Sequence, residues 1–362
     1  MSIEFEFFEA GCGDSILVST SEGTNILIDG GAGGLYTSKL RNLKKSLDLV
    51  VLTHLVVLTH LDDDHILGLR DLLKFDVDKI AKNDKYVPYI KEVWYNAFRN
   101  TSNTNDIEFK PPRRATTISI KNQLKFREYM SLVQGKIQYR DYISIDYITK
   151  PLDINDVTII LLSPNDDKLK DLYLKYEKEI KKTIISTSNR CKDFSSMIED
   201  LYKESFSDTD DSSISNGSSI AFILIYQNKK FLFLADAHIP LIVDSLKRVK
   251  EQYFKDEERM EFEFIKLSHH GSRNNINYKF LDLVQSENYI ILTNSKRHKH
   301  PDKETLSKIL VHNRKLNYPH KINFRFNYSS VAKDSRYGFT QKDKERYNFE
   351  LIHSNHYPFG GK

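Results

Sequence analysis

Short apolar runs separated by glycine-rich and polar segments give the start of the chain an alternating strand and helix pattern. Ile3 to Phe8 reads as a strand, and so does Asn25 to Ile28, which ends in Asp29 followed by a run of glycines. The spacing over Lys39 to Leu47 predicts a helix, and Leu49 to Leu58, rich in β-branched residues, predicts a buried strand. This alternation predicts an α/β fold.

That predicted strand contains a tandem repeat: the sequence LVVLTH occurs at Leu49–His54 and again at Leu55–His60. The repeat lengthens the strand by about 20 Å at ~3.3 Å per residue, and its even length preserves the alternation of side chains. A natural extension and a duplication in the sequence record both fit the pattern. Only the second copy adjoins an acidic cluster, so we expect His54 to be a strand residue and not a metal ligand.

The middle of the chain differs from its ends. Charged, tyrosine and aliphatic residues at helix-like spacings predict a mainly helical insertion over residues 75–205. We expect this insertion to serve as a lid, a substrate platform or a docking region for a protein partner. Residues 1–74 and 206–362 then form the main domain. A hairpin is predicted from Ile220–Tyr226 and Phe231–Leu234. The other predicted elements are helices at Ile239–Tyr253 and Tyr278–Gln285 and strands at Val157–Leu162, Glu261–Leu267 and Tyr289–Thr293.

Composition narrows the class of protein. With 362 residues, 40% of them hydrophobic, the chain can bury a sizeable core, and a net charge of +4 tolerates a nucleic-acid substrate without requiring one. The two cysteines, Cys12 and Cys191, lack the spacing of a zinc knuckle and favour a reducing compartment. The chain has neither a secretory signal nor a run of roughly 20 apolar residues, so we expect a cytoplasmic protein without a membrane partner.

The strongest chemical signal is HLDDDH at residues 60–65, placed between an apolar strand and the start of a helix. Side chains two apart in an extended backbone share a face, so His60 and Asp62 are predicted to hold one cation, and Asp64 and His65 a neighbouring one. Imidazole and carboxylate ligands suit zinc, manganese or iron. Asp63 should point away and cap the helix. The alternative is a solvated acidic loop.

Two further strand ends carry candidate ligands. Asp236 follows the apolar run that ends at Leu234, and His269 and His270 follow a third predicted strand. We predict that Asp236 and at least one of the two histidines bind metal. His300 is predicted to contact substrate or to protonate a leaving group, the alternative being an exposed basic loop. His238 is expected at a helix start.

Strand ends on one sheet edge converge, so these side chains predict a shared cleft. Two ions held there would lower the pKa of a bridging water to near 7 and clamp the oxygens of a displaced group, which is the chemistry of hydrolysis. Asp29, at the end of the second strand, is expected to orient a ligand histidine.

Five motifs, in order along the chain, resemble those of the metallo-β-lactamase fold superfamily, and within it the hydrolase domain of ComEC-type DNA-uptake competence proteins. They are GCGDSILV at 11–18, ILIDGG at 26–31, THLDDDH at 59–65, NGSSIAFIL at 216–224 with FLFLADAH at 231–238, and LSHHGSRNN at 267–275 with HKHP at 298–301. The resemblance implies a four-layer αβ/βα sandwich with a large mainly helical insertion.

The resemblance also implies one or two metal ions, zinc or manganese. The implied ligands are His60, Asp62, Asp64, His65, Asp236 and one of His269 or His270. Asp64 and His300 are the expected catalytic residues. Asp14 and Asp29 are expected to contact the ligand side chains and not the metal itself. The chain departs from the wider superfamily in having no histidine between His65 and Asp236.

The leading functional hypothesis is a phosphodiesterase or nuclease that uses a metal-bound hydroxide on nucleic acid or a nucleotide-like ester. The second is hydrolysis of a lactam, lactone or thioester. The third is a non-catalytic scaffold or sensor subunit of a bacterial multi-protein system. Metal content separates the third hypothesis from the first two, because a scaffold has no need to retain stoichiometric metal.

Overall fold

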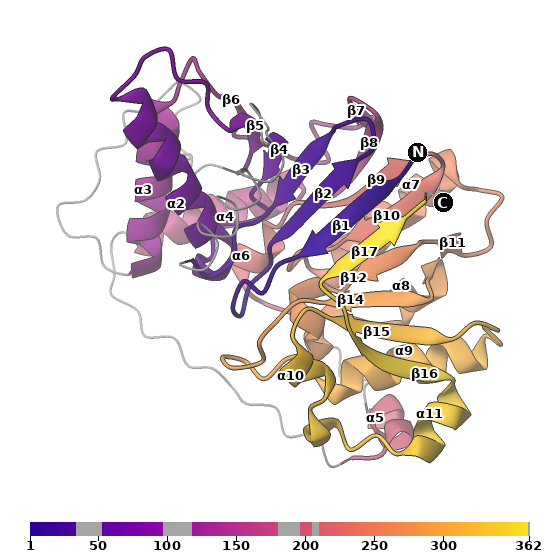
Figure 1. The fold of residues 1–362 in the computed structure, drawn as a ribbon. Coiled ribbons are helices and arrows are strands. Elements are labelled where there is room, and N and C mark those ends of the chain that lie inside the picture. The colour runs from indigo at the N-terminus through magenta and orange to yellow at the C-terminus, as the bar shows by residue number, and fades with distance from the viewer. Residues whose placement is uncertain (34–52, 97–117, 180–195, 205–209, 361–362) are drawn as a thin grey trace. The chain divides into compact units, whose positions relative to one another are not determined.

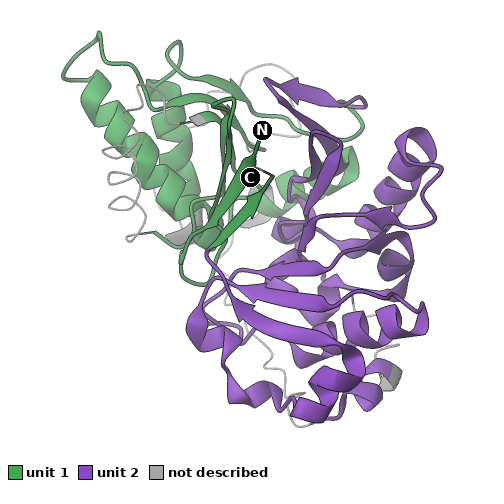
Figure 2. Cartoon of the chain, turned by 45° about the vertical axis from the view of Figure 1, so that its right-hand side comes forward, with its two compact units in different colours: residues 1–148, 164–187, 356–362 green, residues 149–163, 188–355 purple. Residues whose placement is uncertain are grey.

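The structure, a computed structural model, describes residues 1–33, 53–96, 118–179, 196–204 and 210–360 (Figure 1). These residues form two compact units, each with its own sheet (Figure 2). Unit 1 comprises residues 1–148, 164–187 and 356–362, and unit 2 comprises residues 149–163 and 188–355.

Among the described residues of unit 1, seven strands form one mixed sheet in the order β17-β1-β2-β3-β4-β5-β6. The strands are β1 (Ile3–Phe7), β2 (Ile16–Thr20), β3 (Asn25–Ile28), β4 (Thr53–Val57), β5 (Ile90–Trp94), β6 (Gln138–Arg140) and β17 (His356–Phe359). β17, β1, β2 and β3 pair antiparallel, whereas β3, β4, β5 and β6 pair parallel. The carboxyl ends of β3 and β4 therefore meet at one edge of this sheet.

The described residues of unit 1 form three helices: α2 (Asp63–Ile80), α3 (Ile118–Leu132) and α4 (Asp166–Glu179). α2 places apolar residues at helical spacing, and Ile66, Leu69 and Leu73 are buried in the same core as Val56 of β4 and Phe126 of α3. The helix that follows the HLDDDH motif is therefore fixed by the core on one face, and α3 packs beside it (Figure 1).

Unit 2 is built on a second mixed sheet, of eight described strands in the order β16-β15-β14-β12-β10-β9-β8-β7. The strands are β7 (Leu152–Ile154), β8 (Val157–Ser163), β9 (Ala221–Tyr226), β10 (Lys229–Phe233), β12 (Phe264–Lys266), β14 (Asn288–Ile291), β15 (Ile322–Phe326) and β16 (Phe349–His353), while β11 (Met260–Glu261) and β13 (Val284–Gln285) form a small separate sheet. β10, β12, β14, β15 and β16 run parallel, so their carboxyl ends share one edge.

The predicted hairpin is confirmed as β9 and β10, which pair antiparallel. Its turn residues, Gln227 and Asn228, have φ values of 49° and 65°. Two successive left-handed residues form the tight turn whose twist matches that of the flanking strands, and asparagine tolerates this conformation. The turn is therefore two residues long, whereas the predicted strands left the four residues 227–230 between them, because β10 already begins at Lys229.

The helices of unit 2 are α5 (Ile198–Glu204), α6 (Ile214–Gly217), α7 (Ile239–Tyr253), α8 (Tyr278–Leu283), α9 (Lys303–Lys315), α10 (Ser329–Ala332) and α11 (Gln341–Tyr347), with short 3-10 turns at Ser268–Gly271, Arg273–Asn275 and Ser335–Tyr337. α7 has the bounds that its apolar spacing predicts, and His238 is its N-cap residue, as expected of a helix start. Ile242 and Leu246 of α7 are buried with Leu232 of β10.

The α/β class is confirmed, since each unit joins a mixed sheet to helices. Within the described part of the interval 75–205, β5 and β6 join one sheet and β7 and β8 join the other, beside the helices α3, α4 and α5. The role of this interval as a lid, a substrate platform or a docking region stays a prediction. The helix expected at 39–47 and the first four residues of the repeat lie outside the described residues.

His54 lies in β4, where its Nδ1 accepts a hydrogen bond from the backbone N–H of Asn25 at 3.2 Å, so its assignment to a strand is confirmed. Within the part of the chain that the structure describes, no helix combines the length and the apolar character needed to cross a membrane.

Candidate metal centre

In unit 1 the candidate residues follow β3 and β4, whose last residues, Ile28 and Val57, are register partners. Asp29 is fully buried and adopts a left-handed backbone with φ of 57°. Its Oδ1 accepts the Thr59 backbone N–H at 2.8 Å, and its Oδ2 accepts the Thr59 hydroxyl at 2.7 Å and His65 Nδ1–H at 2.8 Å. A single carboxylate thus ties the end of β3 to both sides of the HLDDDH motif.

These hydrogen bonds fix the tautomers of two histidines. Because Asp29 accepts from Nδ1 of His65, the proton sits on Nδ1 and the lone pair on Nε2. The Thr59 hydroxyl gives its proton to Asp29, so it can only accept at its 3.1 Å contact with His60 Nδ1. His60 therefore also presents an Nε2 lone pair. Both rings are buried, with centroids 4.1 Å apart, so two metal-competent nitrogens lie close together.

The aspartates of the motif take different positions. Asp62 is the N-cap residue of α2, and its Oδ2 lies 3.8 Å from His60 Nε2. The carboxylate of Asp64 lies within 4.8 Å of a ring nitrogen of His65. The prediction that Asp63 caps the helix is wrong: α2 begins one residue earlier, with the N–H groups of His65 and Ile66 bonded to the Asp62 carbonyl.

A brace from α3 holds the motif from the opposite side. Asn122 Nδ2 donates to Asp63 Oδ1 at 2.8 Å, and Gln123 Nε2, from a buried side chain, donates to the Leu61 carbonyl at 2.7 Å. The residues that accept these bonds, Leu61 and Asp63, alternate along the chain with the candidate ligands His60, Asp62 and Asp64. Sequence reasoning missed this brace, because Asn122 and Gln123 lie about sixty residues downstream and belong to no motif.

Close backbone approach sets the position of α2. A Cβ on Gly68 would lie 2.0 Å from the Gly30 carbonyl oxygen, and one on Gly30 would lie 2.2 Å from the Leu69 backbone nitrogen. Only glycine fits both positions. Asp14, also buried, offers an oxygen that lies within 4.8 Å of ligand atoms of Asp29 and His65. Its predicted place behind the ligands stays a prediction.

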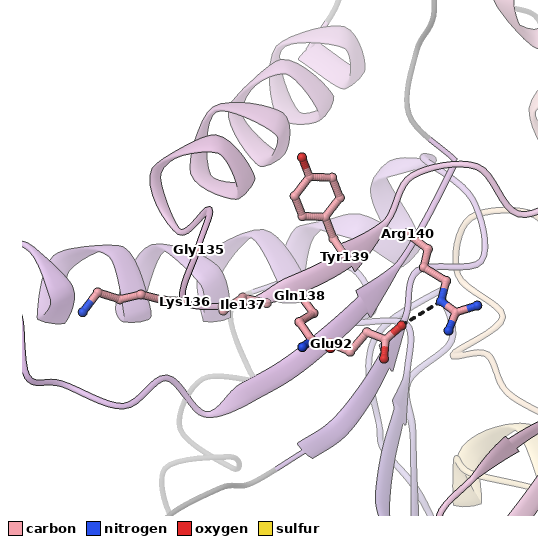
Figure 3. Close-up of a pocket in the computed structure, with 7 residues that line it drawn as sticks. All are labelled: Glu92, Gly135, Lys136, Ile137, Gln138, Tyr139 and Arg140. Atoms are coloured by element: carbon pink, nitrogen blue, oxygen red, sulfur yellow. Dashed lines mark hydrogen bonds and ion pairs between the residues drawn. The ribbon is translucent and has the colours of Figure 1, made fainter. Parts of the chain in front are cut away.

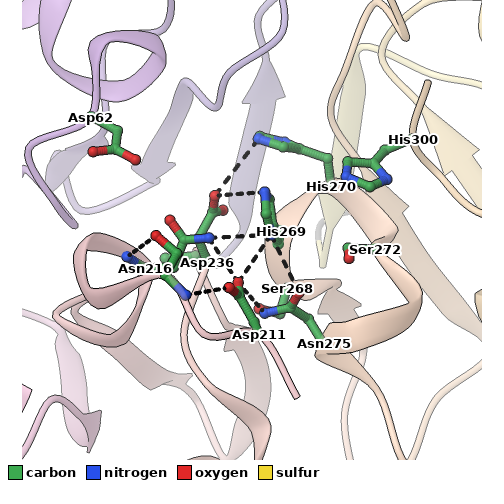
Figure 4. A network of polar contacts seen from close by, with 12 residues as sticks. Asp62, Asp211, Asn216, Asp236, Ser268, His269, His270, Ser272, Asn275 and His300 are labelled. Carbon is green, nitrogen blue, oxygen red and sulfur yellow. Dashed lines mark hydrogen bonds and ion pairs between the residues drawn. The ribbon is translucent and has the colours of Figure 1, made fainter. Parts of the chain in front are cut away.

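In unit 2 the candidate residues follow β10 and β12, which are parallel neighbours. Asp236 comes after β10, and the His269 N–H bonds to the Ala235 carbonyl at 2.9 Å, which joins the two strand ends. Asp236 Oδ2 lies 3.8 Å from His269 Nε2 and 3.9 Å from His270 Nε2 (Figure 4). The structure thus brings together the aspartate and both histidines.

These separations fit ligands of one ion better than hydrogen-bond partners. Nitrogen and oxygen ligands bonded to zinc at ~2.1 Å in a tetrahedral site lie roughly 3.4 Å apart. Direct hydrogen bonds between a ring N–H and a carboxylate span about 2.7–3.2 Å. Asp236 paired with one of the two histidines therefore fits two ligands of one divalent cation of the zinc or manganese kind.

The tautomers of this pair are fixed in the same way as those in unit 1. His270 Nδ1 donates to the Leu292 carbonyl at 2.8 Å, and His269 Nδ1 donates to Asp211 Oδ2 at 3.1 Å. Both Nε2 atoms therefore keep their lone pairs. The two histidines are left-handed, with φ values of 45° and 55°. Such strain costs roughly 1–2 kcal/mol per residue and clusters at functional sites.

Asp211 is a functional candidate that sequence reasoning missed, because the run around it reads as a polar loop. Its carboxylate accepts from the Ser213 N–H at 2.8 Å, Asn216 Nδ2 at 2.7 Å and Asn275 Nδ2 at 3.1 Å, besides His269 (Figure 4). Burial by itself raises the pKa of Asp211, but the hydrogen bonds from His269, Asn216 and the Ser213 N–H outweigh burial and hold that pKa well below its usual range. Asp211 is therefore an ionised anchor for His269.

His300 lies beside this group, with its ring centroid 5.2 Å from that of His269. Its side chain is 14% exposed, and Nδ1 lies 3.4 Å from Asp302 Oδ2. Burial lowers the pKa of His300 below its ordinary value, and the neighbouring Asp302 carboxylate opposes that shift. The predicted alternative of an exposed loop applies to residues 296–299 and not to His300 itself.

A separate pocket in unit 1 contains none of the predicted residues. It is lined by Glu92 and residues 135–140 (Figure 3). Glu92 Oε1 accepts from Trp94 Nε1 at 2.7 Å and from Arg140 Nε at 3.0 Å, and Arg140 also lies over the Trp94 ring. These contacts make Glu92 and Arg140 part of a structural network at the edge of the sheet, and the third charged residue of the lining, Lys136, is paired with Asp84.

Comparison with known proteins gives a family match and several weak structural likenesses. The metallo-beta-lactamase fold protein YhfI from Bacillus subtilis is 9% identical over 100% of both chains, with a TM-score of 0.40. Zn(2+)-bound PqqB from Methylobacterium extorquens is 7% identical over 99% of this chain and 100% of its own, at 0.43. A long form RNase Z from yeast is 14% identical over 90% of this chain and 36% of its own, at 0.39.

All three TM-scores are below 0.5, and no curated protein gives a significant match. The family model described as "Metallo-beta-lactamase superfamily" matches residues 11–121. That segment contains Asp14, Asp29 and the whole HLDDDH motif with its α2 helix. The similarity to the metallo-β-lactamase superfamily thus extends over residues 11–121.

Proposed function

We propose that the chain is a metal-dependent phosphodiesterase that acts on nucleic acid or a nucleotide-like ester. The observation that carries this proposal is the tautomer pattern of four histidines. His60, His65, His269 and His270 each have Nδ1 engaged with a protein group, so each Nε2 keeps its lone pair. Histidines that serve only as surface or core residues have no need of a shared orientation of this kind.

The proposed ligands are those that the motifs imply. In unit 1, His60 and Asp62 would hold one ion and Asp64 and His65 a neighbouring one. In unit 2, Asp236 with His269 or His270 would also bind metal. Zinc or manganese held there would supply a Lewis acid and activate water at neutral pH. The proposed ComEC-type closeness rests on the same motifs.

The chain's own residues have distinct proposed roles. Asp29 and Asp211 hold the ligand rings in place through Nδ1 and exclude the wrong tautomer. Asp64 is proposed both to bind metal and to take part in catalysis. His300 is proposed at the substrate end, where Asp302 orients its ring for proton exchange with the leaving group.

The carboxylate-rich ligand set favours a phosphodiester over a carbon ester. Asp62, Asp64 and Asp236 are hard oxygen ligands, which suit manganese as well as zinc. Metal ions held by such ligands would supply Lewis-acid stabilisation of the charge on the phosphoryl oxygens. Hydrolysis of a lactam, lactone or thioester is the alternative enzyme activity.

The test is a cleavage assay with bis-p-nitrophenyl phosphate, single-stranded DNA and RNA, beside nitrocefin, a lactone and a thioester. Each substrate is offered with zinc or manganese to the native protein and to the double variant Asp64→Ala, His65→Ala. Metal-dependent cleavage of phosphodiesters that the double variant lacks would support the proposal.

Two other results would contradict the proposal. Turnover of the carbon esters alone would replace it with the second hydrolase activity. A protein that retains no stoichiometric metal and turns over no substrate would instead favour the scaffold or sensor hypothesis. The buried variant Asp76→Asn serves as a control for loss of folding, since Asp76 is buried at the far end of α2 and accepts from the Tyr86 hydroxyl.

A further inference from the structure

The loop after β14 carries a concentration of positive charge beside the candidate histidines of unit 2. Residues 295–300, the basic loop, include Lys296, Arg297 and Lys299, whose side chains are all exposed. None of the three forms an ion pair with a carboxylate within the described residues, although Lys299 lies near enough to Asp334 to lower its pKa electrostatically. Asp334 itself is paired with Arg336.

The basic loop is held in one conformation by its own hydrogen bonds. The Ser295 N–H donates to Thr293 Oγ1, and the Lys296 N–H donates to Asn294 Oδ1, both at 3.0 Å. Arg336 Nη2 donates to Ser295 Oγ, also at 3.0 Å. A flexible, solvated basic segment needs no such hydrogen bonds. The bonds therefore hold the backbone that carries Lys296, Arg297 and Lys299 in a defined position.

Its backbone is also strained. Ser295 and Lys299 are left-handed, with φ values of 57° and 64°, although neither is glycine or asparagine. Each such residue costs on the order of 1 kcal/mol or more and persists where the surroundings enforce it. The two strained residues lie at the two ends of the exposed basic segment. The conformation that exposes these side chains therefore lowers the stability of the fold.

The basic loop lies directly beside the candidate ligands. β14 is the parallel neighbour of β12, so both strands end at the same edge. The His298 ring stacks on His300 with centroids 5.9 Å apart, and it lies 6.5 Å from the ring of His269. A substrate group bound at His269 would therefore have the charged side chains of the loop on its flank.

We propose that residues 296–299 bind the phosphodiester backbone of a nucleic-acid strand next to the phosphate that is cleaved. This inference rests on the proposed phosphodiesterase function and extends it from a small ester to a polymer. Lysine and arginine contacts to phosphates are the sequence-independent part of nucleic-acid binding. A lactone, a thioester or an isolated mononucleotide ester would have no flanking phosphates for these side chains.

The experiment compares two charge reversals that change the same two residue types. Lys296→Glu with Arg297→Glu alters the basic loop, and Lys247→Glu with Arg248→Glu alters an exposed Lys-Arg pair on α7 as the matched control. Fluorescence anisotropy measures binding of fluorescein-labelled phosphorothioate oligothymidylate and oligouridylate to the manganese-loaded proteins. Phosphorothioates keep the negative charge and resist cleavage, and the two oligomers separate DNA from RNA binding.

We expect the loop variant to lose affinity on the order of tenfold, and the control variant to lose much less. The slope of log affinity against log salt concentration should fall by about 1.4 for two lost contacts, at ~0.7 per phosphate on a single strand. The kcat for bis-p-nitrophenyl phosphate should change far less than the affinity for the oligomers, since this substrate has one phosphate and no flanking ones.

Equal affinities and equal salt slopes in the loop and control variants would overturn the inference, and so would a native protein that cleaves bis-p-nitrophenyl phosphate but binds neither oligomer. Both results would leave the proposed phosphodiesterase intact. Failure of the native protein to cleave any phosphodiester would instead refute the proposed function, and the inference with it.

Discussion

Asp29→Asn tests whether the tautomers of the candidate histidines set metal affinity. The substitution keeps the size of the side chain and removes its charge. In the native protein Oδ1 accepts the Thr59 N–H, while Oδ2 accepts both the Thr59 hydroxyl and His65 Nδ1–H. The asparagine oxygen must stay opposite the Thr59 N–H, because the reverse orientation would bury two N–H groups against each other. The amide NH₂ then faces His65 Nδ1.

His65 consequently changes tautomer, with the lone pair on Nδ1 and the proton on Nε2. The ring now points an N–H at the position of the metal. Returning His65 to the tautomer with its lone pair on Nε2 costs free energy, which weakens metal binding. Loss of a partner that orients a ligand typically reduces metal affinity by about 10–100-fold, or roughly 1.4–2.7 kcal/mol. Apo stability should fall only by the difference between charged and neutral hydrogen bonds, about 1 kcal/mol for each of the three bonds that Asp29 accepts.

Competition with a chromophoric chelator measures zinc affinity, and urea denaturation of the apo protein measures stability. Asp76→Asn is the matched control, since this aspartate is also fully buried in unit 1 and accepts the Tyr86 hydroxyl at 2.8 Å and the Tyr89 N–H. It should lose stability and keep its zinc affinity. A zinc affinity for Asp29→Asn within about threefold of the native value would refute the tautomer reasoning.

Three further predictions concern the brace, the glycine contact and the pH dependence. Gln123→Leu leaves the buried Leu61 carbonyl without its side-chain donor, so the free energy of unfolding should fall by about 1–3 kcal/mol in urea denaturation, with weaker zinc binding. An unchanged zinc affinity would show that the brace does not position the motif. Gly68→Ala places a Cβ 2.0 Å from the Gly30 oxygen, so thermal unfolding should show a loss of roughly 1–3 kcal/mol; native stability would refute the close approach. Burial lowers the pKa of His312, so the folded state binds fewer protons than the unfolded state and stability falls as the pH drops below about 6.5. His312→Gln should reduce that slope in denaturation measured across pH, and an identical slope would contradict the assignment.

Local pattern in the sequence was enough to predict many elements of the fold. The β9–β10 hairpin and α7 follow from strict apolar spacing bounded by turn residues, which depends on neighbours only a few positions away. Asp29 and Asp236 could be singled out for a similar reason. Each lies within three residues of the end of a buried strand, and the ends of parallel strands meet at a sheet edge.

The sequence by itself therefore determined the class of fold and the residue types gathered at the strand ends. Only the tertiary structure decided how those residues are held. Asp211 reaches His269 across 58 positions, and Gln123 reaches Leu61 across 62, so no periodicity or spacing marks either contact. The tautomer of each histidine was equally hidden, because it depends on which group faces Nδ1 once the chain has folded.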